Sequence, residues 1–383
     1  MFGTLIGIIV GLLILVILVV VHELGHAIVA RRNGVVVEEF GIGFPPRAWS
    51  KKLKSGVLFT LNWLPLGGFV KLQGEHDAAR KKGDYGAATL WQKTKILLAG
   101  VLMNWIVAVF LLTILAWTGL PKILPNQFSL ASDSTIIKQP VEASTVSKDS
   151  PAQKAGIQTG DQIIRFAGEP VNTASDLVDS TKLNKGKTVE IIYSRHGIEY
   201  STQVSLRSSN ENGQGFLGVG PYQREQIRAS WSAPIVGIVT TGQFTIVTLQ
   251  GLGDLVANTA KGIVLQFSTD QTNRDEAKQD LKTAGDSVAG PIGILGTIFP
   301  AASAAGPTQL VFLTAIISLT LAVMNVLPIP ALDGGRWFVM VIFRLLKKPL
   351  TKEREEKIQG VGFMVLMALV VFITVLDVTK LFK

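Results

Sequence analysis

The stretch that decides the fold is residues 1–26, MFGTLIGIIVGLLILVILVVVHELGH. Its first 21 residues carry no charge, and a helix needs about 20 mostly apolar residues to cross the core of a bilayer. A cleaved signal peptide would begin with a basic region and end at small residues, and this stretch has neither feature. We therefore expect residues 1–30 to form a retained transmembrane helix that ends in a cluster of ionisable side chains.

That cluster, His22-Glu23-Leu24-Gly25-His26, has the pattern HExxH. On a helix the two histidines lie one turn apart on one side, where they can hold a single Zn²⁺. Zinc lowers the pKa of a bound water toward about 7, and Glu23 is placed to accept its proton. Ionisable groups in an apolar helix are costly and usually functional. The alternative is a helix end at which His and Glu only reach the lipid headgroups.

A catalytic zinc site needs a third protein ligand. Of the other two histidines, His76 lies in a basic loop and His196 at a hairpin turn, so both are expected to be solvated. The better candidate is Asp333, which follows 46 uncharged residues and precedes Arg336. A lone carboxylate there is costly unless it is paired or bound to a metal. The alternative is a turn-forming Asp in front of two glycines.

The composition argues against an ordinary soluble protein. Charged residues make up 17% of the chain, against about 25% in soluble globular domains. The absence of cysteine excludes disulfides and thiolate ligands. Further uncharged stretches predict transmembrane helices over 96–121, within 287–335 and over 358–377. The chain is therefore expected to be a polytopic α-helical membrane protein.

Lys and Arg favour cytoplasmic loops. Segment 31–95 has 12 basic and 5 acidic residues and segment 336–357 has 7 and 3, whereas 121–230 is nearly balanced with 12 and 11. The first two are therefore expected inside and the third outside. The net charge of +9 lies beside the predicted spans, where anionic lipid explains it, so no nucleic-acid partner is expected.

The two predicted parts of the metal site also restrict the number of crossings. His22, His26 and Asp333 are each expected at the C-terminal end of an apolar helix. They lie at the same depth in the membrane only if the two helices run in the same direction, which requires an odd number of membrane crossings between them. Helix 96–121 supplies one crossing. The uncharged stretch 229–253 is long enough to span, but a single further crossing would break this condition. Residues 229–286 are therefore expected to form a membrane-surface segment and a polar linker.

Two segments have the pattern of β-structure. In 56–75 the side chains of Phe59, Leu61 and Trp63 alternate, and Pro65 with Gly67-Gly68 supplies a turn, which predicts a membrane-associated β-hairpin in the loop 31–95. Segment 121–230 has strand-like runs separated by turn signals, which predicts an inserted mixed α/β domain.

These motifs together resemble the site-2 protease family of intramembrane zinc metalloproteases, in particular its bacterial regulator-type members with one PDZ domain. HELGH at 22–26 and LDGG at 332–335 are its signature elements. The resemblance implies that His22, His26 and Asp333 bind one Zn²⁺ per chain and that Glu23 is the catalytic base. Asn325 matches an asparagine that acts near the scissile peptide. Asn104, in a GxxxN element that begins at Gly100, would contact substrate. Hydrogen bonding between helices is the alternative for both asparagines.

The same resemblance extends to both β-segments. It implies that the hairpin receives an unwound substrate as an added strand, through Phe59, Leu61, Trp63, Gly67 and Gly68; a hairpin that only lies at the membrane interface is the alternative. Residues 135–220 resemble the PDZ domain of this class, with AGIQTGD at 155–161 as the most recognisable run. Such a domain could bind peptide C-termini on the outer side.

The expected activity is peptide-bond hydrolysis within transmembrane segments of single-pass proteins in a bacterial cytoplasmic membrane, such as anti-sigma factors or remnant signal peptides. One alternative is a membrane-anchored metalloprotease that cuts soluble or peripheral proteins at the cytoplasmic face. The other is a transporter or PDZ scaffold without enzymatic activity. Zinc content and cleavage assays separate the three.

Overall fold

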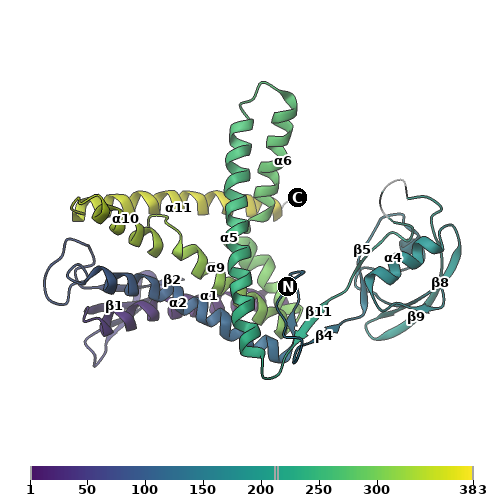
Figure 1. The fold of residues 1–383 in the computed structure, drawn as a ribbon, viewed down its shortest axis with the longest axis horizontal. Coiled ribbons are helices and arrows are strands. Elements are labelled where there is room, and N and C mark those ends of the chain that lie inside the picture. The colour runs from purple at the N-terminus through teal and green to yellow at the C-terminus, as the bar shows by residue number, and fades with distance from the viewer. Residues whose placement is uncertain (1, 211–212, 214, 382–383) are drawn as a thin grey trace. The chain divides into compact units, whose positions relative to one another are not determined.

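The computed structural model describes residues 2–210, 213 and 215–381. The chain divides into two compact units, which we describe separately (Figure 1). Residues 1–115 and 233–383 form a helical unit, and residues 116–232 form a β-rich unit.

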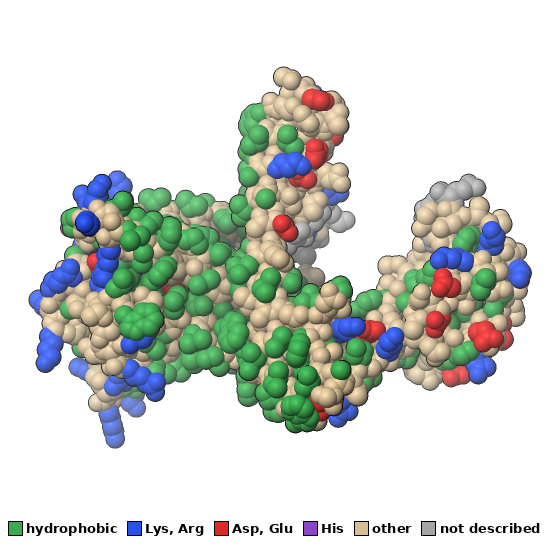
Figure 2. Space-filling view, viewed as in Figure 1, with side chains coloured by type: hydrophobic (Ala, Val, Ile, Leu, Met, Phe, Trp, Pro, Cys, Tyr) green, Lys and Arg blue, Asp and Glu red, His purple; other side chains and the backbone are tan. Residues whose placement is uncertain are grey.

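Five helices among the described residues are long and apolar enough to cross a membrane. They are α1 (Phe2–Arg32), α2 (Leu90–Thr118), α5 (Ala233–Leu265), α9 (Pro307–Val326) and α11 (Lys352–Leu381). Only 17% of the most apolar window of α1 and 6% of that of α11 is buried inside the protein, so their apolar side chains face outward. Figure 2 shows hydrophobic side chains over much of this unit, with Lys and Arg gathered at the end that carries α10 and β1. Such a surface suits lipid rather than water.

Close contacts give the directions of the helices. His26, near the end of α1, bonds to Ile96 near the start of α2, so these helices are antiparallel. Gly11, near the start of α1, packs against Phe299, which precedes α9. Asp333, which follows α9, meets His22. Helices α1 and α9 therefore run in the same direction, with the metal-site candidates at one end.

Helix α5 and the polar helix α6 (Gln271–Ser287) form a helical hairpin. A β-carbon on Gly262 of α5 would touch Leu281 of α6, and Lys261 pairs with Glu276. The hairpin starts beside the end of α2, where Gly237 meets Thr113, and the chain after it returns to the start of α1. Both points lie at the end opposite His26, so the hairpin adds no net crossing. In Figure 1 α5 runs across the direction of α2 and α11.

The structure corrects the expectation that Asp333 closes an apolar helix. Helix α9 ends at Val326, and Asp333 is the first residue of α10 (Asp333–Leu345). Pro328 and Pro330 lie between the two helices, and proline cannot donate the backbone hydrogen bond that a continuing helix needs. Upstream of α9 the chain forms three short helical pieces, α7 (Pro291–Gly293), η1 (Ile294–Ile298) and α8 (Phe299–Ala304).

The loop between α1 and α2 contains the long antiparallel strands β1 (Val37–Lys52) and β2 (Leu58–Leu72). Both strands bend, so each contributes two extended segments to the sheet. The four segments lie side by side, and we call each of them a lane. Residues 37–42 pair on one side with 68–72 and on the other with 58–61, and residues 47–52 pair with 58–62. The spatial order is therefore 68–72, 37–42, 58–62 and 47–52. Only the first and last lanes have a free edge among the described residues.

The β-rich unit contains a six-stranded and a three-stranded sheet. The larger follows the order β10-β5-β6-β8-β9, with β7 paired to β6. Its strands are β5 (Val141–Val146), β6 (Gln162–Phe166), β7 (Glu169–Pro170), β8 (Thr188–Arg195), β9 (Ile198–Ser205) and β10 (Val219–Tyr222). The smaller has the order β3-β11-β4, formed by β3 (Leu120–Pro121), β4 (Thr135–Lys138) and β11 (Glu225–Arg228).

Two helices, α3 (Pro151–Lys154) and α4 (Ala174–Leu183), complete this unit. Its core is formed by alternate strand residues and by one face of α4, including the fully buried Ile163, Phe166, Leu177 and Ile191. Burial of one such side chain contributes about 1.5–3 kcal/mol, so the unit has a core of its own. The unit is wider than the expected 135–220, because the three-stranded sheet joins the segments on either side of that range.

Candidate metal centre

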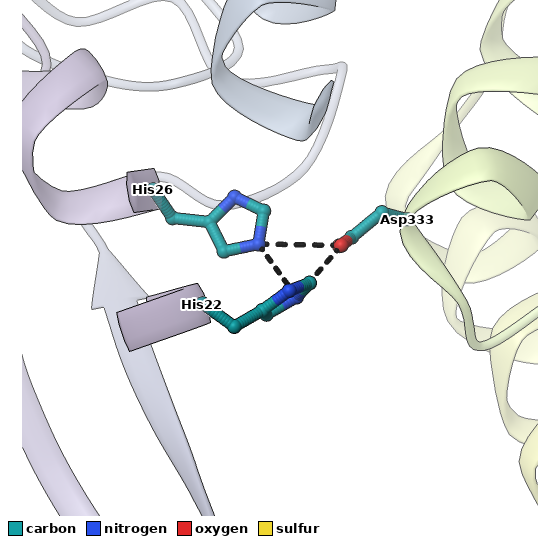
Figure 3. A group of neighbouring side chains, drawn as sticks. All are labelled: His22, His26 and Asp333. Carbon is teal, nitrogen blue, oxygen red and sulfur yellow. Dashed lines mark hydrogen bonds and ion pairs between the residues drawn. The ribbon is translucent and has the colours of Figure 1, made fainter. Parts of the chain in front are cut away.

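Three side chains from distant parts of the sequence converge at one end of the helical unit (Figure 3). His22 Nε2 lies 3.1 Å and His26 Nε2 lies 3.2 Å from Asp333 Oδ2, and the two Nε2 atoms are 3.2 Å apart. Both histidines are buried, and the carboxylate is largely buried. Among the described residues, this is the one group of three or more His, Asp or Glu side chains that could hold a metal ion.

The dimensions of this triangle fit zinc. Zinc holds nitrogen and oxygen ligands at about 2.0–2.1 Å in a tetrahedron, which places two ligands roughly 3.3 Å apart. The three distances of 3.1–3.2 Å lie close to that separation. Two neutral imidazoles and one carboxylate are also typical protein ligands of a catalytic zinc, which keeps one position open. The residues present therefore fit the metal.

Neighbouring groups orient the histidines. His26 Nδ1 donates a hydrogen bond of 2.8 Å to the carbonyl oxygen of Ile96. Because a carbonyl can only accept, this bond places the proton on Nδ1 and leaves the Nε2 lone pair free for a metal. On the other ring, His22 Nδ1 lies 3.5 Å from the side-chain amide of Asn104, which is almost fully buried.

Glu23, His26 and Asp333 line one cavity of about 820 Å³. Its walls also include Val70 and Leu72 of β2, and residues of α11 such as Gln359 and Phe363. A β-carbon on Gly68 would stand 3.5 Å from Glu23 Cγ, so the outermost lane of the sheet passes directly beside this carboxylate. The cavity thus combines two of the three candidate ligands, His26 and Asp333, with the Glu23 carboxylate and a free strand edge.

The other predicted site residues lie outside the triangle. Asn325 donates its side-chain N–H to the carbonyl of Leu321 in its own helix, at 3.0 Å. Gly67 has φ +91° and packs under the Phe44 ring, and Trp63 is 71% exposed. His76 and His196 do not belong to the cluster, whose two histidines are His22 and His26.

The structure gives the lane that carries Phe59 and Leu61 two neighbours in the sheet. Both residues lie in the lane 58–62, which is paired on both sides, with 37–42 and with 47–52. The Phe59 ring stacks on Phe40 and meets Trp49 edge-on. A lane with both edges paired cannot accept a further strand. The free edge beside Glu23 belongs instead to 68–72, and contact of the side chains at 59, 61 and 63 with a substrate stays a prediction.

Sequence reasoning missed several residues around the site. Arg336 binds the carboxylates of Glu75 and Glu355 and covers the ring of Tyr85, beside the cavity. A charged residue directly after the Gly-Gly of 334–335 was the signal that could have drawn attention to it. Gly100 supplies the space for both imidazoles, and only its place four residues before Asn104 pointed to it.

Comparisons with known proteins identify the family of the chain. Residues 10–369 match the family model of peptidase family M50. A Clostridium perfringens protein named as a candidate zinc metalloprotease is 33% identical over 94% of this chain and 95% of its own. The zinc metalloprotease RasP of Geobacillus kaustophilus is 26% identical over 95% of this chain and 96% of its own.

A structural comparison matched a PDZ domain from Listeria monocytogenes at 23% identity. It covers 21% of this chain and 86% of that one with a TM-score of 0.20, which is too low to bear on the fold. The family match, in contrast, spans nearly the whole chain and includes all three clustered residues. The chain therefore belongs to peptidase family M50, the site-2 protease family, and is a zinc metalloprotease.

Proposed function

We propose that this protein hydrolyses peptide bonds within transmembrane segments of single-pass membrane proteins, with His22, His26 and Asp333 as its zinc ligands. The observation that supports this most directly is the place of the triangle. Two of its corners lie on α1, an apolar helix of membrane-spanning length, and the third follows α9, a second one. The gathered Lys and Arg at that end of the unit favour its placement toward the cytoplasm (Figure 2).

When bound, zinc supplies the acidity that makes water a nucleophile at neutral pH. Glu23 is the general base in this proposal, because its carboxylate lines the same cavity as His26 and Asp333 without belonging to the candidate ligand group. It takes the proton of the attacking water and returns it to the amine that leaves. His26 is held in the required tautomer by Ile96.

The lane 68–72 is the proposed binding edge for the substrate. A transmembrane helix hides its peptide bonds in internal hydrogen bonds, so it must be unwound before hydrolysis. A free strand edge offers replacement partners to the unwound backbone. Gly68 lies beside Glu23, and Val70 of the same lane lines the cavity, which brings such a strand to the catalytic groups. Asn325 and Asn104 remain candidates for contacts with the substrate backbone.

In the β-rich unit, we propose a PDZ-type groove on the outer side of the membrane. Strand β10 is at the edge of the six-stranded sheet, and α4 packs beside it. A peptide C-terminus could add as a strand to β10 with its side chains against α4. The substrates would then be proteins already trimmed on the outer side, such as anti-sigma factors or remnant signal peptides, and α5 would lie along the outer membrane surface.

The test is a cleavage assay with purified protein in lipid vesicles. One sequence is offered twice, as the transmembrane segment of a single-pass protein and as a soluble peptide. We expect cleavage of the membrane form only, about one zinc per chain, and a loss of about 10²–10⁴ in rate for Glu23→Gln with zinc retained. Preferred cleavage of the soluble form would instead identify a protease of the cytoplasmic face.

A further inference from the structure

The free lane of β2 has a defined end. Residue Leu72 is its last residue, and the chain turns at Gln73 and Gly74. The backbone N–H of Gln73 bonds to Val36, on the side of β1. Since successive backbone N–H groups of a strand point to opposite sides, the N–H groups of Leu72 and Val70 point to the free edge. An added strand would find its donors there.

Both of these donors already face a carboxylate of the chain: the N–H of Val70 bonds to Glu23, which an added strand would have to displace, and the N–H of Leu72 bonds to a second glutamate. The N–H of Leu72 donates to Glu75 Oε2 at 3.1 Å. The Glu75 carboxylate therefore stands where the carbonyl of an added strand would lie if pairing continued past Val70. All three residues line the cavity that contains Glu23 and Asp333.

Glu75 is itself held by Arg336. The guanidinium of Arg336 donates to Glu75 Oε1 at 2.7 Å and to the backbone oxygen of Glu75 at 2.5 Å. It also donates to Glu355 at 3.3 Å and covers the ring of Tyr85. Arg336 lies one helical turn after Asp333 on α10. The end of the free edge and a candidate zinc ligand are thus fixed by the same helical turn.

We propose that Glu75 closes the free edge of β2 at Leu72 and so sets the register of the substrate strand, with Arg336 as the positioning residue that holds Glu75. This rests on the proposed function, in which the substrate adds to lane 68–72. The register of a strand decides which peptide bond reaches Glu23, and it changes in steps of two residues if the same face is kept. Glu75 is therefore a determinant of the cut site.

The test maps the cut site by mass spectrometry on one single-pass protein that the wild-type chain cuts at a single bond. Glu75→Ala frees the Leu72 N–H, and Glu75→Asp keeps the charge for Arg336 with a side chain one methylene shorter. We expect both variants to give an added cut two residues from the original one. Glu75→Gln, whose amide oxygen can still accept, should keep the single cut.

Glu355→Ala is the matched control, because it also removes a carboxylate partner of Arg336 but leaves Leu72 bonded to Glu75. It should leave the position of the cut unchanged. The original single cut in both Glu75→Ala and Glu75→Asp would overturn the proposal. If the wild-type chain cuts no transmembrane segment, the proposed function itself fails, and that result is distinct from an unchanged cut site.

A second measurement applies to variants that fold but do not cleave the substrate. The chain has no cysteine, so a single Val70→Cys in a Glu23→Gln background can be cross-linked to substrates that carry one cysteine at successive positions. With Glu75 present, we expect cross-linking to be strongest at one substrate position. With Glu75→Ala, a second position two residues away should appear, and its absence would overturn the proposal.

Discussion

Gly100 of α2 lies so close to His26 that a β-carbon on residue 100 would stand 2.4 Å from His26 Nε2. The same β-carbon would stand 2.6 Å from His22 Cε1. Because Gly100 has no side chain, both imidazoles can lie against the backbone of α2, which forms one wall of the metal centre.

From this contact we expect Gly100→Ala to weaken zinc binding by at least about tenfold, the scale on which groups that orient metal ligands act. The added methyl group must push one imidazole away from the triangle. Zinc per chain after dialysis against a weak chelator measures the effect. Gly242→Ala on α5 is the control, since nothing lies within 4 Å of its β-carbon, and it should keep full zinc. Full zinc in Gly100→Ala would show that the imidazoles bind in another arrangement.

The Asn104 amide supports His22 in a way that can be tested. If His22 binds zinc through Nε2, its Nδ1 carries a proton and needs an acceptor. Asn104 Oδ1 is buried and has no hydrogen-bond partner, and turning the amide over places it toward Nδ1. We expect Asn104→Ala to lose about 10–100-fold in zinc affinity, measured by competition with a chelator. Asn104→Asp retains an acceptor and should recover most of it; equal losses in both variants would argue against this role.

Asp377, near the end of α11, fixes the chain before α9. Its carboxylate accepts the backbone N–H groups of Gly290 at 3.2 Å and Gly293 at 2.8 Å, and the residue is buried. Asp377→Ala leaves these two donors without a partner, which costs about 1–3 kcal/mol for a buried group. A lower midpoint of thermal unfolding in detergent is expected. Asp254→Ala, at an exposed position of α5, should leave the midpoint unchanged; an equal drop in both would contradict this explanation.

Asp133 gives the β-rich unit a defined acid sensitivity. Its carboxylate accepts hydrogen bonds from the side chains and backbone N–H groups of Ser230 and Ser232, and these bonds lower its pKa from 3.8 to about 2. A lowered pKa in the folded state means that the stabilisation is complete above pH 3.8 and is lost as the pH falls toward 2. We expect Asp133→Ala to be less stable than wild type at pH 7, with the difference shrinking as the pH falls from about 4 through the folded-state pKa of about 2. Thermal unfolding of the full chain across this range measures it, and a difference as large at pH 2 as at pH 7 would contradict this account.

The sequence determined the elements whose cause is local. Uncharged stretches of the required length predicted the long apolar helices, and the spacing of His22 and His26 placed both on one face of a helix. The isolation of Asp333 in an uncharged segment predicted that it would need a partner, and the structure places it 3.1 Å from His22. In each case the cost of charge in an apolar environment is visible in the sequence itself.

Only the tertiary structure decided the relationships that depend on how distant segments meet. The pattern of Phe59 and Leu61 gives the alternation of a strand but not the number of its neighbours, so the free edge at 68–72 was visible only once the sheet had four lanes. The closeness of Gly100 to His26 and the bond from Leu72 to Glu75 are likewise contacts of packed surfaces. The periodicity of the sequence indicates which side of a helix or strand is apolar. The packing of one element against another decides which atoms come into contact.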